Sequence, residues 1–443
     1  TFELWYMQMQ QLAPNADWLL PSYNGQTLYV SNMLGFSQIT TPRNVFKQFL
    51  KKTLPAGMAG IEGRGMVALP NQKVLAATEK NGFFLLDITT GKHESFLVKE
   101  RNQQAADSVF VSRSVYLEND SIVWTSEYSR LQMKGAVLRI NVNARTYDRF
   151  LLDQFVNHIC WLGNNRVVAI TEPMHNEPAR LVELRYTPKG STLSPMLLQN
   201  ITENVSMQRP AFTMLAKNGH LWYATDGGVY EIDINAKKIL QAFVSPAFEQ
   251  KGETFPLHTI LPVGHAMVLH ESADGKIWVG TNGGGINIID PQTATNTTLT
   301  KENGLADNRV CGILYDKKNY WFSTWHGISM YDPRQKSFQN FYETDGLTNN
   351  ECNRFSFLLD GHGFGWIGGL NGFNVFDPVA LRRRFSGATM ILASLSYHTN
   401  SDDELATITA NFPQHAAIRL PAAQPSLTVK LAFSDLGYTS SNS

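Results

Sequence analysis

The residue types best suited to ligand recognition in this chain stand at predicted strand entrances and turns. Polar pairs precede apolar strand-like segments at Asn157-His158, Gln208-Arg209, Asn308-Arg309 and Asn353-Arg354. Guanidinium and amide groups donate hydrogen bonds to hydroxyl, carboxylate or sulfate oxygens, and an exposed indole can stack on a sugar ring. We therefore predict a ligand-binding set with no catalytic member: Arg209, Asn282, Arg309, Trp325, His326, Arg354 and Asn371.

Some of these positions also have an architectural explanation. An Asn at a strand entrance often caps a turn, and an Arg there often pairs with a carboxylate of a neighbouring sheet. Asn308 and Asn350 recur at one place in a repeat, and we predict that they cap turns. Arg309, Arg354 and Trp325 exceed what the repeat requires, so both explanations stay open for them.

Catalysis and metal binding have little support in the sequence. The carboxylates are scattered, and four of them repeat at turn positions: Asp233, Asp290, Asp332 and Asp377. The 11 histidines form no HxxxH or HExxH pair. His265 and His270 are five residues apart on a predicted strand and so face opposite sides. We expect no catalytic residue, no metal and no cofactor in this chain.

The elements that position these side chains are indicated by a repeated pattern. A Trp is followed by a Gly six residues later and then by an Asp that ends an apolar run, starting at Trp222, Trp278, Trp321 and Trp366. The last three Trp residues follow one another at intervals of 43 and 45 residues. Self-similarity at this period, built on short strands, is typical of a β-propeller blade.

One repeat can be divided into four strands. Segments starting at Arg309 and Asn319 predict the first two, HGISMYDP turns at Gly327 into the third, and SFQNFYE closes the blade. We expect positive φ at the hairpin Gly, a Trp packed between sheets, and Asp-Pro at the end of the third strand. Weaker copies upstream, including 17–49, predict seven or eight blades, with Phe2–Gln10 as a candidate strand to close the ring.

The residue pattern changes after Pro378, where alternating apolar and polar residues predict half-buried strands of a second β domain. We therefore expect an all-β chain: a propeller of seven or eight four-stranded blades at 1–380, and a partial β-sandwich at 381–443.

With 38 Lys+Arg against 38 Asp+Glu, no basic field attracts nucleic acid. The three cysteines form no CxxC pair, and we expect Cys160 and Cys311, which stand in apolar runs, to be buried thiols.

The downstream repeats carry a specific motif: GLxxNxV, then W-x-G/S-T-x-x-G, then YDP and F-x-x-Y. Here it reads GLADNRVCGILYDKKNYWFSTWHGISMYDPRQKSFQNFYETDGLTNNE. This resembles the two-component regulator propeller repeat of hybrid two-component sensors from Bacteroidetes. The tail IRLPAAQPSLTVKLAFSDLGYTS resembles the opening half of the Y_Y_Y sandwich domain that follows those propellers.

The resemblance implies a periplasmic input region of a membrane-anchored sensor histidine kinase. It implies an oligosaccharide ligand released from a polysaccharide, and signalling through a homodimer formed by the sandwich domain. Nothing in this chain reads as a kinase core, so we expect no enzymatic activity and no nucleic-acid partner for it. Two alternatives stay open: a propeller polysaccharide lyase or hydrolase, and a protein-interaction scaffold.

Overall fold

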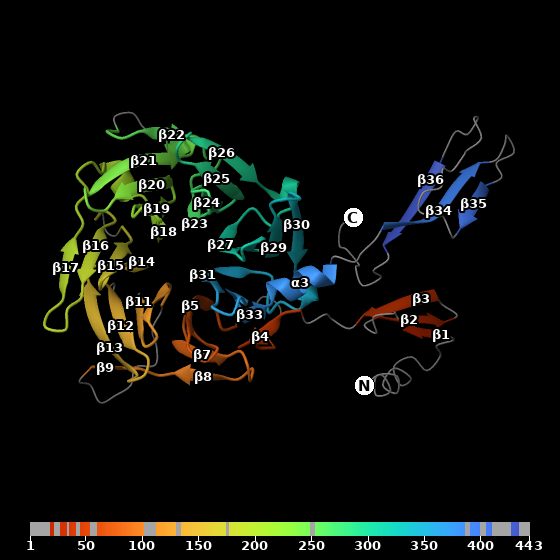
Figure 1. The fold of residues 1–443 in the computed structure, drawn as a ribbon, viewed down its shortest axis with the longest axis horizontal. Coiled ribbons are helices and arrows are strands. Elements are labelled where there is room, and N and C mark those ends of the chain that lie inside the picture. Colours follow the sequence, from red (N-terminus) through yellow and green to blue (C-terminus); the bar gives the residue numbers. More distant parts are fainter. Residues whose placement is uncertain are drawn as a thin grey trace. The chain divides into compact units, whose positions relative to one another are not determined.

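Seven antiparallel sheets of the computed structural model stand around a common axis, and each corresponds to one sequence repeat (Figure 1). The structure describes residues 45–53, 60–101, 112–129, 134–173, 177–248 and 253–385, and the strands at 18–21, 27–32, 35–40, 390–398, 405–409 and 427–433. Within these residues the fold is an all-β propeller. Seven blades are present, so the higher of the two predicted counts was wrong.

The first three blades come from the part of the sequence where the repeat is weakest. Blade 1 contains β5 (Gly63–Leu69), β6 (Lys73–Thr78), β7 (Phe83–Asp87) and β8 (His93–Phe96). Blade 2 contains β10 (Val115–Asn119), β11 (Ile122–Ser129), β12 (Lys134–Asn141) and β13 (Thr146–Leu152), with β9 (Lys99–Glu100) added in parallel outside β13. Blade 3 contains β14 (Val156–Gly163), β15 (Arg166–Thr171), β16 (Leu181–Arg185) and β17 (Thr192–Pro195).

The next three blades carry the clear Trp-Gly-Asp pattern. Blade 4 contains β18 (Pro210–Leu215), β19 (Leu221–Thr225), β20 (Gly228–Asp233) and β21 (Lys238–Val244), with β22 (Leu257–Thr259) in parallel outside β21. Blade 5 contains β23 (Ala266–Glu271), β24 (Ile277–Thr281), β25 (Ile286–Asp290) and β26 (Thr295–Leu299). Blade 6 contains β27 (Val310–Tyr315), β28 (Tyr320–Thr324), β29 (Gly327–Asp332) and β30 (Ser337–Phe341).

Blade 7 closes the ring with strands from both ends of the propeller sequence. It contains β31 (Cys352–Leu359), β32 (Gly365–Gly369), β33 (Gly372–Phe376) and, as its outer strand, β4 (Lys47–Phe49). Phe373 pairs with Phe49, and Val375 pairs with Lys47. Closure by an N-terminal strand was predicted, but the strand is β4 rather than Phe2–Gln10, a segment that lies outside the described residues. The inner strands β31 and β5 then lie side by side.

The repeated Trp residues pack between neighbouring blades, as predicted. Trp321 of blade 6 is 1% exposed and lies 4.5 Å from Phe376 of blade 7, measured between ring centroids. Its indole Nε1 donates to Asp316 at 2.7 Å. Trp278 of blade 5 stacks on Tyr320 of blade 6 at 3.9 Å. These contacts bury most of the large apolar area of each indole and hold adjacent sheets face to face.

Two of the repeated hairpin glycines have the positive φ that was predicted for them. Gly327 and Gly372 both have φ of 96°. A Cβ at Gly372 would lie 2.2 Å from the carbonyl oxygen of Phe49 in the closing strand. At Gly284 the prediction was wrong, since its neighbours Gly283 and Gly285 take the positive φ, at 111° and 69°.

The chain outside the blades forms a second compact unit, Thr1–Arg43 with Val379–Ser443, while Asn44–Pro378 holds the propeller. One sheet of this unit contains β1 (Trp18–Pro21), β2 (Thr27–Asn32) and β3 (Gly35–Thr40). A second sheet has the order β35-β34-β36, from β34 (Met390–His398), β35 (Leu405–Thr409) and β36 (Leu427–Phe433). The segment 17–49 therefore adds only β4 to the propeller. The sandwich expected at 381–443 stays a prediction.

Short helices complete the described part of the chain. They are α2 (Glu203–Met207), α3 (Pro378–Phe385) and the 3-10 turns Pro246–Phe248, Lys301–Asn303 and Glu343–Asp345. No helix among the described residues has the length and apolar character needed to cross a membrane.

Candidate ligand-binding face of the propeller

One face of the propeller collects the loops that lead into the inner strands and the hairpins between second and third strands. We call it the mouth face. Backbone bonds tie these two kinds of loop together from blade to blade: Gly283 N–H donates to the carbonyl of Asn308 at 3.1 Å, Gly327 to Asn350 at 2.7 Å, and Gly372 to Ile61 at 2.7 Å. The predicted site residues therefore belong to one face, because they lie in these loops or at the inner-strand entrances.

The recurring Asn residues cap turns, as predicted. The side-chain carbonyl of Asn308 accepts a hydrogen bond from Lys301 N–H at 2.8 Å, and Asn350 accepts one from Glu343 N–H at 2.8 Å. The four repeated aspartates were expected to serve architecture, and Asp290 and Asp332 each accept from two backbone N–H groups just after their strands.

Four predicted site residues come together at blades 5 and 6. The guanidinium of Arg309 lies over the indole of Trp325 at 4.8 Å, and Asn282 forms an isolated β-bridge with Arg309. Trp325 is half-buried and the adjacent His326 is exposed. Arg309 also binds Asp307 through two bonds of 2.8 and 2.9 Å. Burial opposes ionisation of Asp307, but the bonds and charge of Arg309 lower its pKa.

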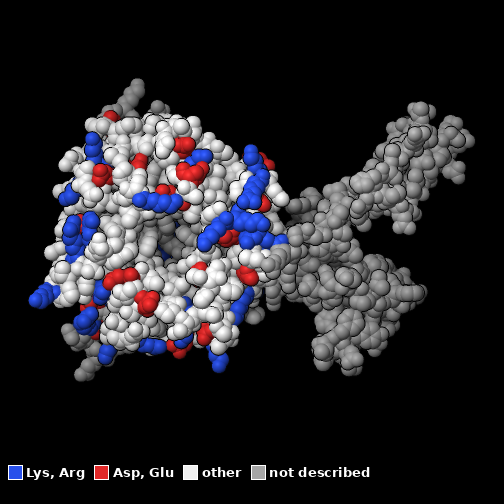
Figure 2. All heavy atoms as spheres, in the orientation of Figure 1, with Lys and Arg blue, Asp and Glu red and all other residues white. Residues whose placement is uncertain are grey.

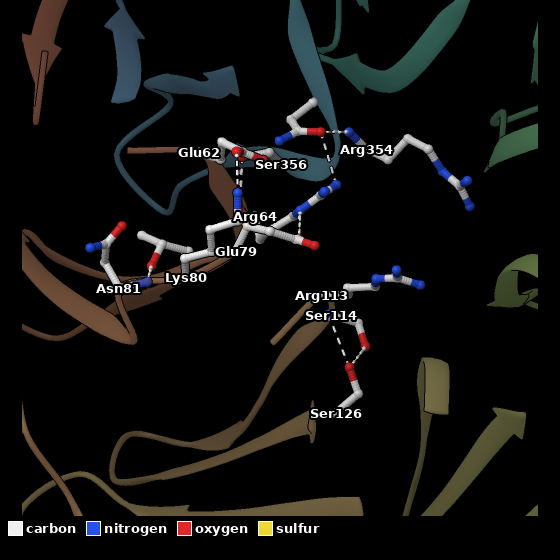
Figure 3. Close-up of polar contacts among 12 residues, drawn as sticks. Glu62, Arg64, Glu79, Lys80, Asn81, Arg113, Ser114, Ser126, Arg354 and Ser356 are labelled. Atoms are coloured by element: carbon white, nitrogen blue, oxygen red, sulfur yellow. Dashed lines mark hydrogen bonds and ion pairs between the residues drawn. The ribbon is translucent and has the colours of Figure 1, made fainter. Parts of the chain in front are cut away.

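The other three predicted residues lie at different places and make different contacts. Arg209 is exposed at the entrance of β18, where its backbone N–H donates to Asp226 at 3.0 Å. Asn371 is buried and bonds the backbone of Lys52 in both directions, accepting from its N–H at 3.0 Å and donating to its carbonyl at 2.9 Å. These contacts hold the segment that follows the closing strand β4. Arg354 lies in β31 and points toward the centre of the ring (Figure 3).

Arg354 belongs to a cluster of three arginines at the channel mouth, two of which the sequence analysis missed. Arg64 of β5 and Arg113, just before β10, extend toward the same region (Figure 3). Arg64 pairs with Glu79 at 2.5 Å, and Arg113 pairs with Glu172 at 3.0 Å. Both stand at inner-strand entrances, as Arg354 does. The position could have revealed them, but blades 1 and 2 lack the Trp-Gly-Asp spacing that aligns the repeats.

The environment of Arg354 is unusual for a cation. Burial lowers the pKa of its guanidinium to about 10, and the charges of Arg113 and Arg64 act in the same direction. Among the described residues, Nε and Nη2 of Arg354 are closed off from solvent and have no hydrogen-bond partner. Its charge reaches across the ring, because it adds to the effect of burial in lowering the pKa values of His158 and His265.

Aromatic rings from three blades pack together next to this cluster. Phe355 of blade 7 stacks on His158 of blade 3 at 5.3 Å and on Phe212 of blade 4 at 6.2 Å. The guanidinium of Arg354 lies 5.0 Å over the ring of Phe355. The Arg354 guanidinium and three rings from blades 3, 4 and 7 therefore pack together inside the ring of blades. On the propeller face drawn in Figure 2, acidic and basic side chains alternate without a field of one sign.

Burial disfavours the charged forms of titratable groups elsewhere in the propeller. Burial lowers the pKa of His158 to about 3 and raises those of Cys160 and Cys311 to about 12. Cys160 and Cys311 are buried free thiols, as predicted, and so is Cys352. The described ranges contain no group of three His, Cys, Asp or Glu side chains that could hold a metal ion.

The fold defines this chain as one built on a seven-bladed β-propeller. Solved structures match the chain at low sequence identity. YCF48 bound to D1 peptide matches with a TM-score of 0.50 and 12% identity, over 76% of this chain and 98% of that chain. The WD40 propeller domain of Doa1 matches with a TM-score of 0.49 and 13% identity, over 75% and 97%. The extracellular domain of BT3049 from B. thetaiotaomicron, described as a hybrid two-component system, matches with a TM-score of 0.33 and 13% identity, over 91% and 68%.

The likeness to YCF48 shows the fold alone. No protein-family model matches the sequence, and no curated protein matches it.

Proposed function

We propose that this chain is the ligand-sensing region of a periplasmic sensor of the hybrid two-component type, and that its propeller binds an oligosaccharide at the mouth face. The sequence support is the motif GLADNRV…YDP…FQNFY with its following Tyr-containing tail, which resembles the repeats and sandwich of such sensors. The fold supports it as well, since propellers commonly present loops around a central channel as a binding surface.

The observation that carries the proposal is the chemistry of the mouth face. It combines a half-buried indole, Trp325, with several guanidinium and amide donors, while the thiols are buried and His158 is held neutral by its low pKa. Stacking surfaces with surrounding hydrogen-bond donors recognise sugars without requiring chemistry. We therefore assign the chain a binding role without catalysis.

In this proposal, oligosaccharide binding changes signalling by shifting the populations of two homodimer arrangements. An oligosaccharide that binds one homodimer arrangement more tightly would favour that arrangement, with a coupling of roughly 1–3 kcal/mol. The C-terminal strands would form part of a dimerising sandwich next to a membrane anchor outside this chain. Kinase activity would lie beyond the anchor, and no nucleic-acid partner is assigned to this region.

A binding screen tests the proposal. The chain is heated with oligosaccharides from plant and host polysaccharides, and a ligand at about 100 times its Kd should stabilise it by roughly 2.7 kcal/mol. Chromatography of each positive sample then shows whether the saccharide is intact. A hit with intact saccharide supports the sensor. Product formation would support a lyase or hydrolase instead, and a blank screen with a protein captured on the mouth face would support a scaffold.

A further inference from the structure

We propose that the three-arginine cluster at the channel mouth is a site for one oxyanion, a carboxylate or sulfate carried by an acidic saccharide. The saccharide part of this inference rests on the proposed function, whereas the oxyanion site rests on the geometry of Arg354, Asn353 and their neighbours.

The backbone that carries Arg354 departs from the other blades. In β27, one residue bulges between Val310 and Gly312 while the facing residues of β28 are adjacent. The same single-residue bulge occurs in β14, β18 and β23. In β31, four residues lie between Cys352 and Phe357, opposite the single residue between Gly369 and Ile367. Such bulges redirect side chains and concentrate at functional sites.

This large bulge contains a strained residue. Phe355 has φ of 65°, in the left-handed region that bulky side chains rarely adopt. A bond from Ser356 Oγ to the carbonyl of Arg64 at 2.8 Å, and the stacking of Phe355 on His158, hold it in place. Strain that the surroundings maintain in this way points to function. Its consequence here is that the guanidinium of Arg354 is placed over the ring of Phe355.

The unpartnered groups at this place are all donors. Nε and Nη2 of Arg354 and Nδ2 of Asn353 are buried without a partner among the described residues. The side-chain oxygen of Asn353 is already used, because it accepts from Arg64 at 2.8 Å and from Arg354 N–H at 3.2 Å. A ligand that satisfies this set must supply acceptors, and a guanidinium presents its N–H groups in the spacing of a carboxylate or sulfate.

Two of the three arginines in the cluster are neutralised by carboxylates, and one positive charge remains. Glu79 neutralises Arg64 and Glu172 neutralises Arg113, while no carboxylate among the described residues pairs with Arg354. A cation held away from water without a counterion is costly. One monoanionic group would balance the cluster.

The first experiment measures the oxyanion site with inorganic sulfate at constant ionic strength. Sulfate stabilises proteins generally, so the readout is the difference in melting-temperature rise between the wild type and R354M. We expect a larger, saturable rise in the wild type and only the general rise in R354M. R334M, which removes an exposed arginine from the turn after β29, serves as the matched control and should behave as the wild type. Equal rises in all three proteins would overturn the oxyanion site.

R354M also separates a binding arginine from a structural one. Without ligand, we expect it to melt at the same temperature as the wild type or higher, because it removes an unpaired buried charge. R354K keeps the charge but loses the paired N–H groups, and should bind sulfate more weakly than the wild type. A strongly destabilised R354M together with unchanged sulfate binding by R354K would assign Arg354 to packing and contradict the site.

The second experiment compares three saccharide classes of equal length by calorimetry: neutral galactan, galacturonan and sulfated galactan oligomers. We expect one acidic class to bind at least about tenfold more tightly than the neutral one, and R354M to remove that advantage. Tighter binding of neutral oligomers would leave the proposed function standing and overturn this inference. Sulfate binding at Arg354 with no saccharide binding would sustain the oxyanion site and overturn its assignment to saccharides together with the proposed function.

Discussion

Phe355 and His158 stack with their ring centroids 5.3 Å apart, although they belong to blades 7 and 3, which are not neighbours in the ring. Phe355 therefore crosses the channel and seals His158 from solvent. The Nδ1 atom of His158 lies 2.9 Å from Thr213 Oγ1, and burial lowers the pKa of the imidazole to about 3. This contact joins blades 7 and 3 across the ring and helps to bury the His158 imidazole, whose pKa burial lowers.

The pKa of His158 predicts how stability depends on pH. The folded-state pKa of about 3 lies below the ordinary value of 6.5, so between these values the unfolded chain binds a proton that the folded chain does not. The contribution of neutral His158 is complete above pH 6.5 and is lost as pH falls. H158Q should reduce the slope of unfolding free energy against pH by about 1.4 kcal/mol per pH unit between pH 6 and 4.

Denaturant unfolding at several pH values checks this prediction. His270, whose pKa burial lowers to about 4, contributes a similar slope in both proteins and so cancels in the comparison. Parallel curves for wild type and H158Q would show that His158 is not the group responsible.

Removal of two tryptophans of blade 6 should affect stability and ligand binding differently. Trp321 is buried between blades and bonded to Asp316, so W321A should lower the free energy of unfolding by about 3–5 kcal/mol. Trp325 is half-buried on the mouth face, and W325A should change stability by less than about 1 kcal/mol. Loss of a stacking surface should weaken saccharide binding by roughly tenfold. Unchanged calorimetric affinity in W325A would remove Trp325 from the site.

Ring closure depends on a very short strand. Deletion of residues 1–43 leaves β4 and its contacts intact, whereas deletion of 1–53 removes Phe49, which stacks on Trp366 at 5.6 Å, and Phe46, which packs between Phe341 and Phe376. We expect the longer deletion to lower the melting temperature of the propeller by roughly 10 °C or more relative to the shorter one. Equal melting temperatures in a calorimetric scan would mean that β4 does not close the ring.

The two hairpins of blade 7, between β31 and β32 and between β32 and β33, offer a matched pair of glycines. Gly372 has φ of 96°, and its Cβ would meet the Phe49 carbonyl, so G372A should destabilise by more than about 2 kcal/mol. Gly361 has no atom within 4 Å of a built Cβ, so G361A should be neutral or slightly stabilising. Chemical unfolding of both variants measures the difference, and similar values would refute the steric argument.

The sequence predicted the blades well where a physical requirement repeats. Trp321 and Gly327 recur because every inter-blade contact needs a large apolar side chain and every tight hairpin needs positive φ. The closing strand escaped prediction because three residues carry too little alternation to identify a strand. The role of Asn371 was hidden because its partner, Lys52, is 319 residues away.

The arginine cluster was only partly predictable for a related reason. Arg354 was predicted, but Arg64 and Arg113 lie in blades whose turn pattern is degraded, so their common level in the ring could not be aligned from the sequence. The four-residue bulge before Phe357 depends on pairing register, which a single strand sequence does not reveal.

The central claim is that the mouth face binds an oligosaccharide without transforming it. Its most direct test is calorimetric titration of the chain with the best oligosaccharide of the screen, followed by chromatography of the same sample. The account predicts a saturable heat, weakened in W325A and R354M, with the saccharide recovered unchanged. A saccharide consumed during the titration, or binding that neither variant weakens, would contradict it.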